Sequence, residues 1–267
     1  MHRLALLMGF ALTLAAAGLA PAAEPPSNGP CCSVKAQDVN EVETAIRGLQ
    51  EKAAGLKSYQ ARIDYVVKQP LLESQQRRKG LLYYARSDER SSLRIDFQTL
   101  QQDEEKQQRY VEQFLFDGVY LWHIDHQTER VERRQLTEPN KPIDAFALAS
   151  RHVPVLGFSR INDLHKQFEV TLVPEPKDTE SAFQHLHLKV KPQSVYKDDY
   201  VTIDFWIDKK AGLPAKVVAA TTEEEIHEIR LIDPKVNAEM EDKTFQVYVP
   251  KGFSVDVIPL DKGTPKN

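Results

Sequence analysis

Apolar and polar residues alternate along this chain with two different periods. Between residues 38 and 55 the apolar positions recur at steps of three and four, the spacing of one face of an α-helix. Gly55 closes this segment, and glycine is typical of a helix end. We therefore expect an amphipathic helix that begins near Asp38 and ends at Gly55. Its predicted apolar stripe consists of Val39, Val42, Ile46, Leu49, Ala53 and Leu56.

From Tyr59 onward the period changes to two, the spacing of side chains on one face of a β-strand. In the segment from Tyr59 to Val67 every second residue is apolar, and only Val66 breaks the alternation. Similar segments follow at short intervals, which predicts a meander of about eleven strands. The further candidate strands are residues 80–86, 93–97, 110–116, 119–125, 130–136, 169–173, 185–191, 200–208, 213–221, 226–232 and 245–249.

Two features of the middle of the chain complete the predicted fold. Asp117-Gly118 predicts a two-residue hairpin turn of type I′, which needs positive φ at both positions. Residues 142–150 and 159–168 predict two further helices, the second with Ser159 as its N-cap. The fold class is mainly β (α+β). We expect a strongly curved antiparallel sheet, an open half-barrel whose apolar concave face is capped by about three helices.

The first 23 residues have the pattern of a secretory signal peptide. Arg3 precedes an apolar run over residues 4–19, and small residues follow at 20–23. Pro21 and Glu24 end the run too early for a membrane span, although a retained N-terminal anchor is the alternative. We expect cleavage near Ala22-Ala23. The predicted organisation is a signal peptide (1–23), a flexible leader (24–37), a single domain (38–260) and a C-terminal tail (261–267).

The cysteines and the net charge exclude some classes of protein. Cys31 and Cys32 are the only two cysteines and are adjacent, so a disulfide framework is excluded. The residues before them, Asn28-Gly29-Pro30, lack the small apolar box of lipoprotein processing, which argues against a lipid anchor. We expect two thiols that bridge nothing, with an intermolecular disulfide as the alternative. The net charge of −4 argues against a nucleic-acid partner.

Few residues suggest catalysis. His185 and His187 share the polar face of one strand and could bind a metal, but a third ligand would have to come from a neighbouring strand, such as residues 202–208. We expect a solvated face instead, with Asp204 and Asp208 as surface charges. His123, Asp125 and His126 form a second polar group at a hairpin end. No serine lies in a nucleophile elbow and no glycine-rich phosphate loop follows a strand, so we expect neither an enzyme nor a cofactor.

Several segments resemble the LolA family of periplasmic lipoprotein carriers. An amphipathic helix leads into Leu56–Ala61 (LKSYQA), and Gly80–Arg86 (GLLYYAR) follows. Phe116–Asp125 (FDGVYLWHID) is similar to that family's hairpin, in which a DG turn precedes an aliphatic-Trp pair and an Asp. The chain's ending matches as well: Asn237, Asp242 and Phe245 precede the turn and short β tail of residues 249–255 (VPKGFSV).

The resemblance implies a half-barrel that accepts acyl chains in the periplasm and performs no chemistry. It also implies that Arg86 is a latch for a helical lid. Ser87 stands where the family has proline, and an ion pair with a surface carboxylate is the alternative role of Arg86. The family's relatives include lipid-binding and envelope-sensing proteins, so the fold alone does not identify the cargo.

We therefore predict a periplasmic carrier for the acyl chains of lipoproteins or lipids, with possible donor and acceptor proteins at the inner and outer membranes. The alternative is an envelope sensor or scaffold with a filled interior, and a metal-dependent enzyme at His185 and His187 is the third hypothesis. Nine side chains on apolar stripes would meet inside the half-barrel, either as filled core or as the lining of an acyl pocket. They are Tyr65, Phe97, Phe114, Phe116, Tyr120, Trp122, Phe146, Phe205 and Ile207.

Overall fold

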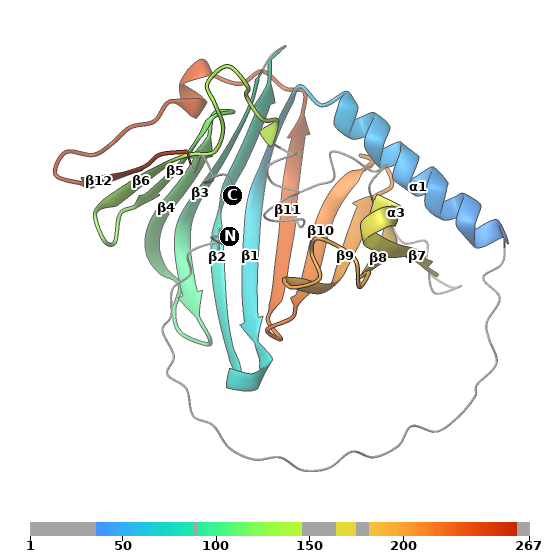
Figure 1. The fold of residues 1–267 in the computed structure, drawn as a ribbon. Coiled ribbons are helices and arrows are strands. Elements are labelled where there is room, and N and C mark those ends of the chain that lie inside the picture. The colour runs from blue at the N-terminus through green and yellow to red at the C-terminus, as the bar shows by residue number, and fades with distance from the viewer. Residues whose placement is uncertain (1–35, 88–89, 146–163, 175–181, 261–267) are drawn as a thin grey trace, which may run out of the picture.

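The computed structural model describes residues 36–87, 90–145, 164–174 and 182–260, and the predicted signal peptide, Cys31, Cys32 and the predicted tail lie outside these ranges. Twelve strands form one strongly curved sheet in the order β12-β6-β5-β4-β3-β2-β1-β11-β10-β9-β8-β7 (Figure 1). Because β7 and β12 end the sheet without pairing to each other, it stays open, as predicted. The strands are β1 (Ser58–Gln69), β2 (Ser74–Arg86), β3 (Ser91–Gln102), β4 (Gln108–Phe116), β5 (Tyr120–Asp125), β6 (Arg130–Gln135), β7 (Phe168–Val173), β8 (Phe183–Val190), β9 (Tyr200–Asp208), β10 (Leu213–Thr221), β11 (Ile226–Val236) and β12 (Ser254–Ile258).

The last strand differs from the prediction in place and direction. Residues 245–249 are not a strand: the 3₁₀-helix η4 (Asp242–Phe245) is followed by an irregular segment. Pro250 and Gly252 then make a turn, and β12 pairs with β6 in parallel, whereas the other pairs of the sheet are antiparallel. Residues 243–253, which we call the C-terminal strap, cross the outer face of the sheet and so find no neighbouring strand to pair with.

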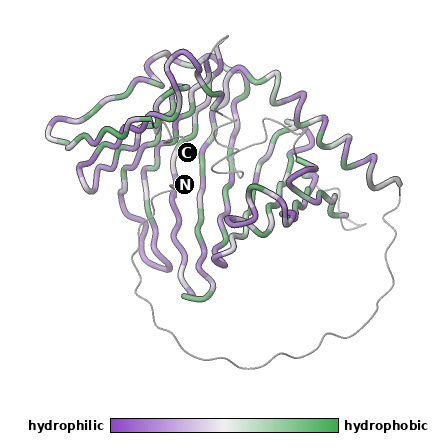
Figure 2. Tube along the Cα trace, in the orientation of Figure 1, coloured by the Kyte–Doolittle hydropathy of each residue, from purple (hydrophilic) through white to green (hydrophobic). Residues whose placement is uncertain are grey.

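Alternation places one face of each central strand in the core. In β1, Tyr59, Ala61, Ile63, Tyr65 and Val67 are all buried on the concave face, while most intervening residues keep contact with solvent. Polar and apolar residues are interspersed along the neighbouring strands (Figure 2). The predicted period of two is therefore confirmed for β1, and it defines a concave face and an outer face for the whole sheet.

Two of the predicted helical segments contain a helix within the described residues. α1 (Ala36–Ala54) confirms the predicted amphipathic helix, and its Val42, Ile46 and Leu49 are buried in the core. α3 (Leu164–Gln167) ends one residue before the predicted end of the helix at 159–168, because Phe168 already begins β7. The predicted start of that helix at Ser159, and most of the predicted helix at 142–150, lie outside the described residues.

The hairpin at Asp117-Gly118 is confirmed, but its turn is not of type I′. Only Gly118 has positive φ, and Asp117 does not. The Asp117 carboxylate instead accepts hydrogen bonds from the backbone N–H groups of Val119 (2.9 Å) and Tyr120 (2.7 Å). Aspartate can build such a turn through its own side chain, which removes the need for positive φ at its position.

Asn237, one of the residues on which the family resemblance rests, joins three elements. Its φ is +52°, a left-handed conformation that Asn tolerates. Its side chain accepts a hydrogen bond from the N–H of Lys57 (2.7 Å) and donates one to the carbonyl of Gly55 (3.1 Å). The end of β11 is thereby tied to the end of α1 and the start of β1.

Candidate functional site

The concave face of the sheet is apolar across its central strands. Residues paired across neighbouring strands project to the same face. Ala61 pairs with Leu82, Leu82 with Ile95, and Ile95 with Phe114. Ala61 and Leu82 are buried, whereas Ile95 and Phe114 are half-buried. We call the concave face of β1–β5 the trough, and this row of side chains crosses it.

α1 covers only one side of the concave face. Its principal contacts are with β7 and β10, and Figure 1 shows it at that side of the sheet. Beneath it, Leu188, Ile203 and Ala219 are completely buried. On β3 and β5, by contrast, Leu93 and Leu121 remain only partly buried. The trough therefore holds apolar surface that α1 does not bury.

Six of the nine predicted cargo residues lie on the concave face. Three of their rings meet across β1, β3 and β4: Tyr65 and Phe97 are stacked with centroids 6.0 Å apart, and Phe97 meets Phe114 edge-on at 6.4 Å. Among the six, Phe114 is the one that is only partly buried. The complete set on this face is Tyr65, Phe97, Phe114, Phe116, Phe205 and Ile207.

The structure does not bring the other three into the trough. Trp122 pairs with Leu115, so both project to the outer face, as does Tyr120 two residues before. There the Arg133 guanidinium lies 5.1 Å from the Tyr120 ring and 5.4 Å from the Trp122 ring. Because Tyr120, Leu121 and Trp122 are consecutive and all apolar, alternation could not decide which of them faces inward. Phe146 lies outside the described residues.

A buried charged cluster that the sequence analysis missed occupies part of the trough. Arg78 Nη1 donates to Glu112 Oε2 at 2.7 Å, and His123 Nε2 lies 2.8 Å from Glu112 Oε1. Arg78 and Glu112 are only 7% and 4% exposed. The His123 ring is also stacked on Phe114 at 4.5 Å. A signal was present, since counting back in steps of two from Tyr84 places Arg78 on the buried face.

Tyr65 and His227 form a second polar contact on the same face. Tyr65 Oη and His227 Nδ1 are 2.7 Å apart, and His227 Nε2 lies 3.3 Å from Glu225. Burial lowers the pKa of His227 more than Glu225 raises it. Burial likewise raises the pKa of Tyr65. Both side chains are therefore uncharged at neutral pH, which suits an apolar surrounding.

The predicted polar group at the end of β5 is not one cluster. His123 faces the trough, whereas His126 lies on the outer face against Phe253, with ring centroids 5.2 Å apart. Asp125 accepts hydrogen bonds from the N–H of Gln127 (2.8 Å) and the hydroxyl of Thr128 (2.9 Å). It therefore shapes the turn between β5 and β6.

Arg86, the predicted latch, connects segments that are distant in sequence. Its Nη2 lies 3.3 Å from Asp144 Oδ2, and its Nη1 is 3.5 Å from the carbonyl of Ala54 at the end of α1. Ser91 donates to the same carboxylate oxygen at 2.8 Å. Arg86 thus makes the ion pair that was the alternative prediction, and it does so between α1, β2 and the segment that contains Asp144.

His185 and His187 face Asp204. This residue lies on the neighbouring strand that was predicted as the source of any third metal ligand. His185 Nε2 and His187 Nδ1 lie 2.7 and 2.9 Å from the same Asp204 oxygen. Asp204 is thus a shared, half-buried hydrogen-bond acceptor and not merely a surface charge. His185 also stacks on Trp206, with centroids 4.3 Å apart. Across the described ranges, no three His, Cys, Asp or Glu side chains are arranged to hold a metal ion.

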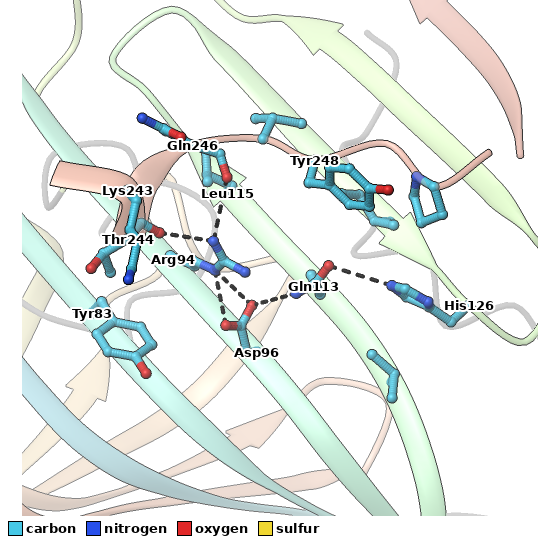
Figure 3. A pocket seen from close by; sticks show the side chains of 14 residues that line it. Tyr83, Arg94, Asp96, Gln113, Leu115, His126, Lys243, Thr244, Gln246 and Tyr248 are labelled. Atoms are coloured by element: carbon cyan, nitrogen blue, oxygen red, sulfur yellow. Dashed lines mark hydrogen bonds and ion pairs between the residues drawn. The ribbon is translucent and has the colours of Figure 1, made fainter. Parts of the chain in front are cut away.

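A cavity of about 580 Å³ lies on the outer face, beneath the C-terminal strap (Figure 3). Leu115 and Ile124 form part of its floor and are nearly buried. Arg94 Nη1 donates to the carbonyl of Thr244 at 2.8 Å and so holds the strap, while its Nε donates to Asp96. The sequence analysis missed this cavity because it had assigned part of the strap to a strand.

Three of the solved structures that resemble this chain are described here, and all have low sequence identity to it. No family model and no curated protein matches this chain by sequence. An uncharacterised conserved protein from Thermus thermophilus is similar over 81% of this chain and 99% of its own, with 11% identity and a TM-score of 0.48. The MucA/MucB complex of Pseudomonas aeruginosa is similar over 78% of this chain and 61% of that chain, with 13% identity and a TM-score of 0.45.

A LolA superfamily protein from Nitrosomonas europaea is similar over 77% of this chain and 97% of its own, with 14% identity and a TM-score of 0.34. Among the helices of the described ranges, none is both long and apolar enough to cross a membrane.

Proposed function

We propose that this protein is a periplasmic carrier that binds the acyl chains of lipoproteins or lipids in the trough. The observation that carries this proposal is the incomplete cover of the concave face. Side chains of β3–β5 such as Ile95 and Phe114 remain half-buried, next to a part of the same face that α1 buries completely. An apolar surface that the protein leaves partly uncovered is a typical site for an apolar ligand.

The physical chemistry of acyl binding fits this surface. Burying a methylene group contributes about 0.8 kcal/mol, so two partly sheltered chains would give useful affinity without directional contacts. Reversible binding requires that the helical cover of the concave face can open. Arg86 ties the end of α1 to the Asp144 segment, and we propose that this tie is a latch that holds the cover in place.

The buried charges of the trough favour a second candidate. Arg78, Glu112 and His123 occupy concave positions that an acyl chain would otherwise contact. A carrier has no need of an ion pair there, whereas a sensor or scaffold with a filled interior could use one to fix its packing. An envelope module without cargo is therefore the alternative function.

Lipid extraction separates the two candidates. The protein purified from the cells that make it would be extracted and its lipids identified by mass spectrometry, and the delipidated protein titrated with a fluorescent fatty acid. We expect co-purified lipid and saturable binding. A protein that carries no lipid and also fails to bind the fatty acid would contradict the carrier proposal and favour the filled module.

Substitution of one ring tests where the cargo binds. Phe114→Ala removes a half-buried ring from the trough, so we expect affinity for the fluorescent fatty acid to fall about tenfold. Trp122→Ala is the matched control, because it removes a ring from the opposite face of the adjacent strand. Circular dichroism and thermal unfolding would show that both variants are folded. Equal loss of affinity in both variants would refute the trough as the binding site.

A further inference from the structure

The turn between β1 and β2 exposes two adjacent leucines. Leu71 and Leu72 are 76% and 62% exposed and belong to the 3₁₀-helix η1 (Pro70–Leu72). Figure 1 shows this turn projecting beyond the turns on either side, and in Figure 2 it is hydrophobic. Single exposed apolar side chains are common on protein surfaces, but an adjacent pair at a projecting tip suggests a contact surface.

Acidic turns flank this tip on both sides. The order of strands places the β3–β4 turn next to β2 and the β10–β11 turn next to β1. Together the two flanking turns carry six acidic residues and a single lysine, Lys106. The acidic residues are Asp103, Glu104, Glu105, Glu223, Glu224 and Glu225. We call the three turns, over residues 70–73, 103–107 and 222–225, the acidic-leucine rim.

Hydrogen bonds hold the three turns together. The N–H of Gln75 donates to Asp103 Oδ1 at 2.6 Å, and Gln69 Nε2 donates to Glu225 Oε1 at 2.7 Å. The leucine turn itself is closed by the N–H of Glu73 on the carbonyl of Pro70 (3.2 Å). Because the surface is already ordered, binding a partner to it would cost little conformational entropy.

The basic side chains at the rim are fewer than its acidic residues: Lys106 lies within the rim, and the exposed Arg109 follows the β3–β4 turn. Lys68 is paired with Glu228, and Arg77 is paired with Asp64. A negatively charged lipid surface would repel the flanking turns before the leucines reached it. A protein surface that offers an apolar cleft bordered by Lys or Arg would satisfy both parts of the rim at once.

We propose that the acidic-leucine rim docks this protein onto a basic protein of the cell envelope, with Leu71 and Leu72 in an apolar cleft of that partner. This docking is independent of whether the trough binds cargo.

The test uses two kinds of vesicle. The first are membrane vesicles from the cells that make the protein, and the second are protein-free liposomes prepared from the lipids of those vesicles. We expect the protein to bind the membrane vesicles, to lose binding when their proteins are digested, and to bind the liposomes weakly or not at all. Raised salt should weaken the binding, because it screens the charged flanks.

Two variants assign the binding to the rim. Leu71→Ser/Leu72→Ser should weaken vesicle binding by about tenfold or more, since both side chains leave water on docking. Glu104→Lys/Glu105→Lys should weaken it through the charge. Val255→Ser/Val257→Ser, which changes exposed valines of β12, is the matched control and should bind normally. The leucine variant should still bind the fluorescent fatty acid, which separates this proposal from the carrier function.

Three outcomes would overturn the proposal: no binding of the unchanged protein to membrane vesicles, equal binding to protein-free liposomes, or unchanged binding of the leucine variant.

Discussion

At the scale of single residues, the trough shows how an apolar face accommodates ionisable groups. Glu112 receives both Arg78 and His123, so its charge is balanced although it is buried. For His227 the folded protein favours the uncharged form instead. It bonds to the Tyr65 hydroxyl, and its burial lowers its pKa, so the folded protein favours the neutral ring.

This shift predicts a pH dependence of stability. Because the pKa of His227 is lower in the folded state than its unfolded value of about 6.5, the unfolded state binds more protons below that pH. The stabilising contribution is complete above about pH 6.5 and is lost as the pH falls towards the folded pKa. Between about pH 7.5 and pH 5 we therefore expect the unchanged protein to lose more free energy of unfolding than His227→Gln, whose side chain does not titrate.

Urea denaturation at each pH measures this difference, because the carboxylates that do not contact His227 titrate alike in both proteins and cancel in the comparison. Parallel curves for the two proteins would show that His227 contributes nothing to the pH dependence.

At the scale of elements, Arg86 is the link between α1 and the Asp144 segment. Both partners of the ion pair are about one third exposed, 34% for Arg86 and 32% for Asp144, so solvent screens the pair and its contribution is modest. The position of this ion pair matters more than its strength, since it lies where α1 and β2 both end.

Arg86→Met should release cargo faster if this tie is a latch. We expect the dissociation rate of the fluorescent fatty acid to rise about two- to fivefold, which corresponds to the loss of a partly exposed ion pair. Stopped-flow dilution measures this rate. Arg94→Met is the matched control, because Arg94 holds the C-terminal strap on the outer face. An unchanged rate in Arg86→Met would leave Arg86 as a structural ion pair only.

At the scale of the whole molecule, the two halves of the concave face differ in cover. Under α1, Leu188, Ile203 and Phe205 are completely buried, whereas Leu93 and Ile95 in the trough are not. Local opening is easier where fewer apolar contacts must be broken. Hydrogen exchange measured by mass spectrometry should therefore show slower exchange in β8–β10 than in β3–β5.

Addition of the fatty acid should slow exchange in β3–β5 and leave β12 unchanged. Uniform exchange across the sheet would contradict the unequal cover inferred from burial.

Local pattern was sufficient for much of this fold, because periodicity is a property of neighbouring residues. The stripe of Val42, Ile46 and Leu49 predicted α1, and the alternation from Tyr59 to Val67 predicted β1 and its buried face. Where the pattern was ambiguous the prediction failed: Trp122 was assigned to the interior because the two residues before it, Tyr120 and Leu121, are apolar too.

Only the tertiary structure decided which distant segments of the chain contact one another. The register that brings Arg78 to Glu112, and Asp204 to both His185 and His187, depends on how strands pair, and pairing is not encoded in the period of a single strand. The path of the strap across the outer face was likewise decided by contacts such as Arg94 to Thr244. The sequence by itself determined which face of most strands is apolar and that the sheet is mainly a meander, because both follow from alternation and short turns. Which apolar side chains remain uncovered depends on where α1 lies, and that is a property of the packed molecule.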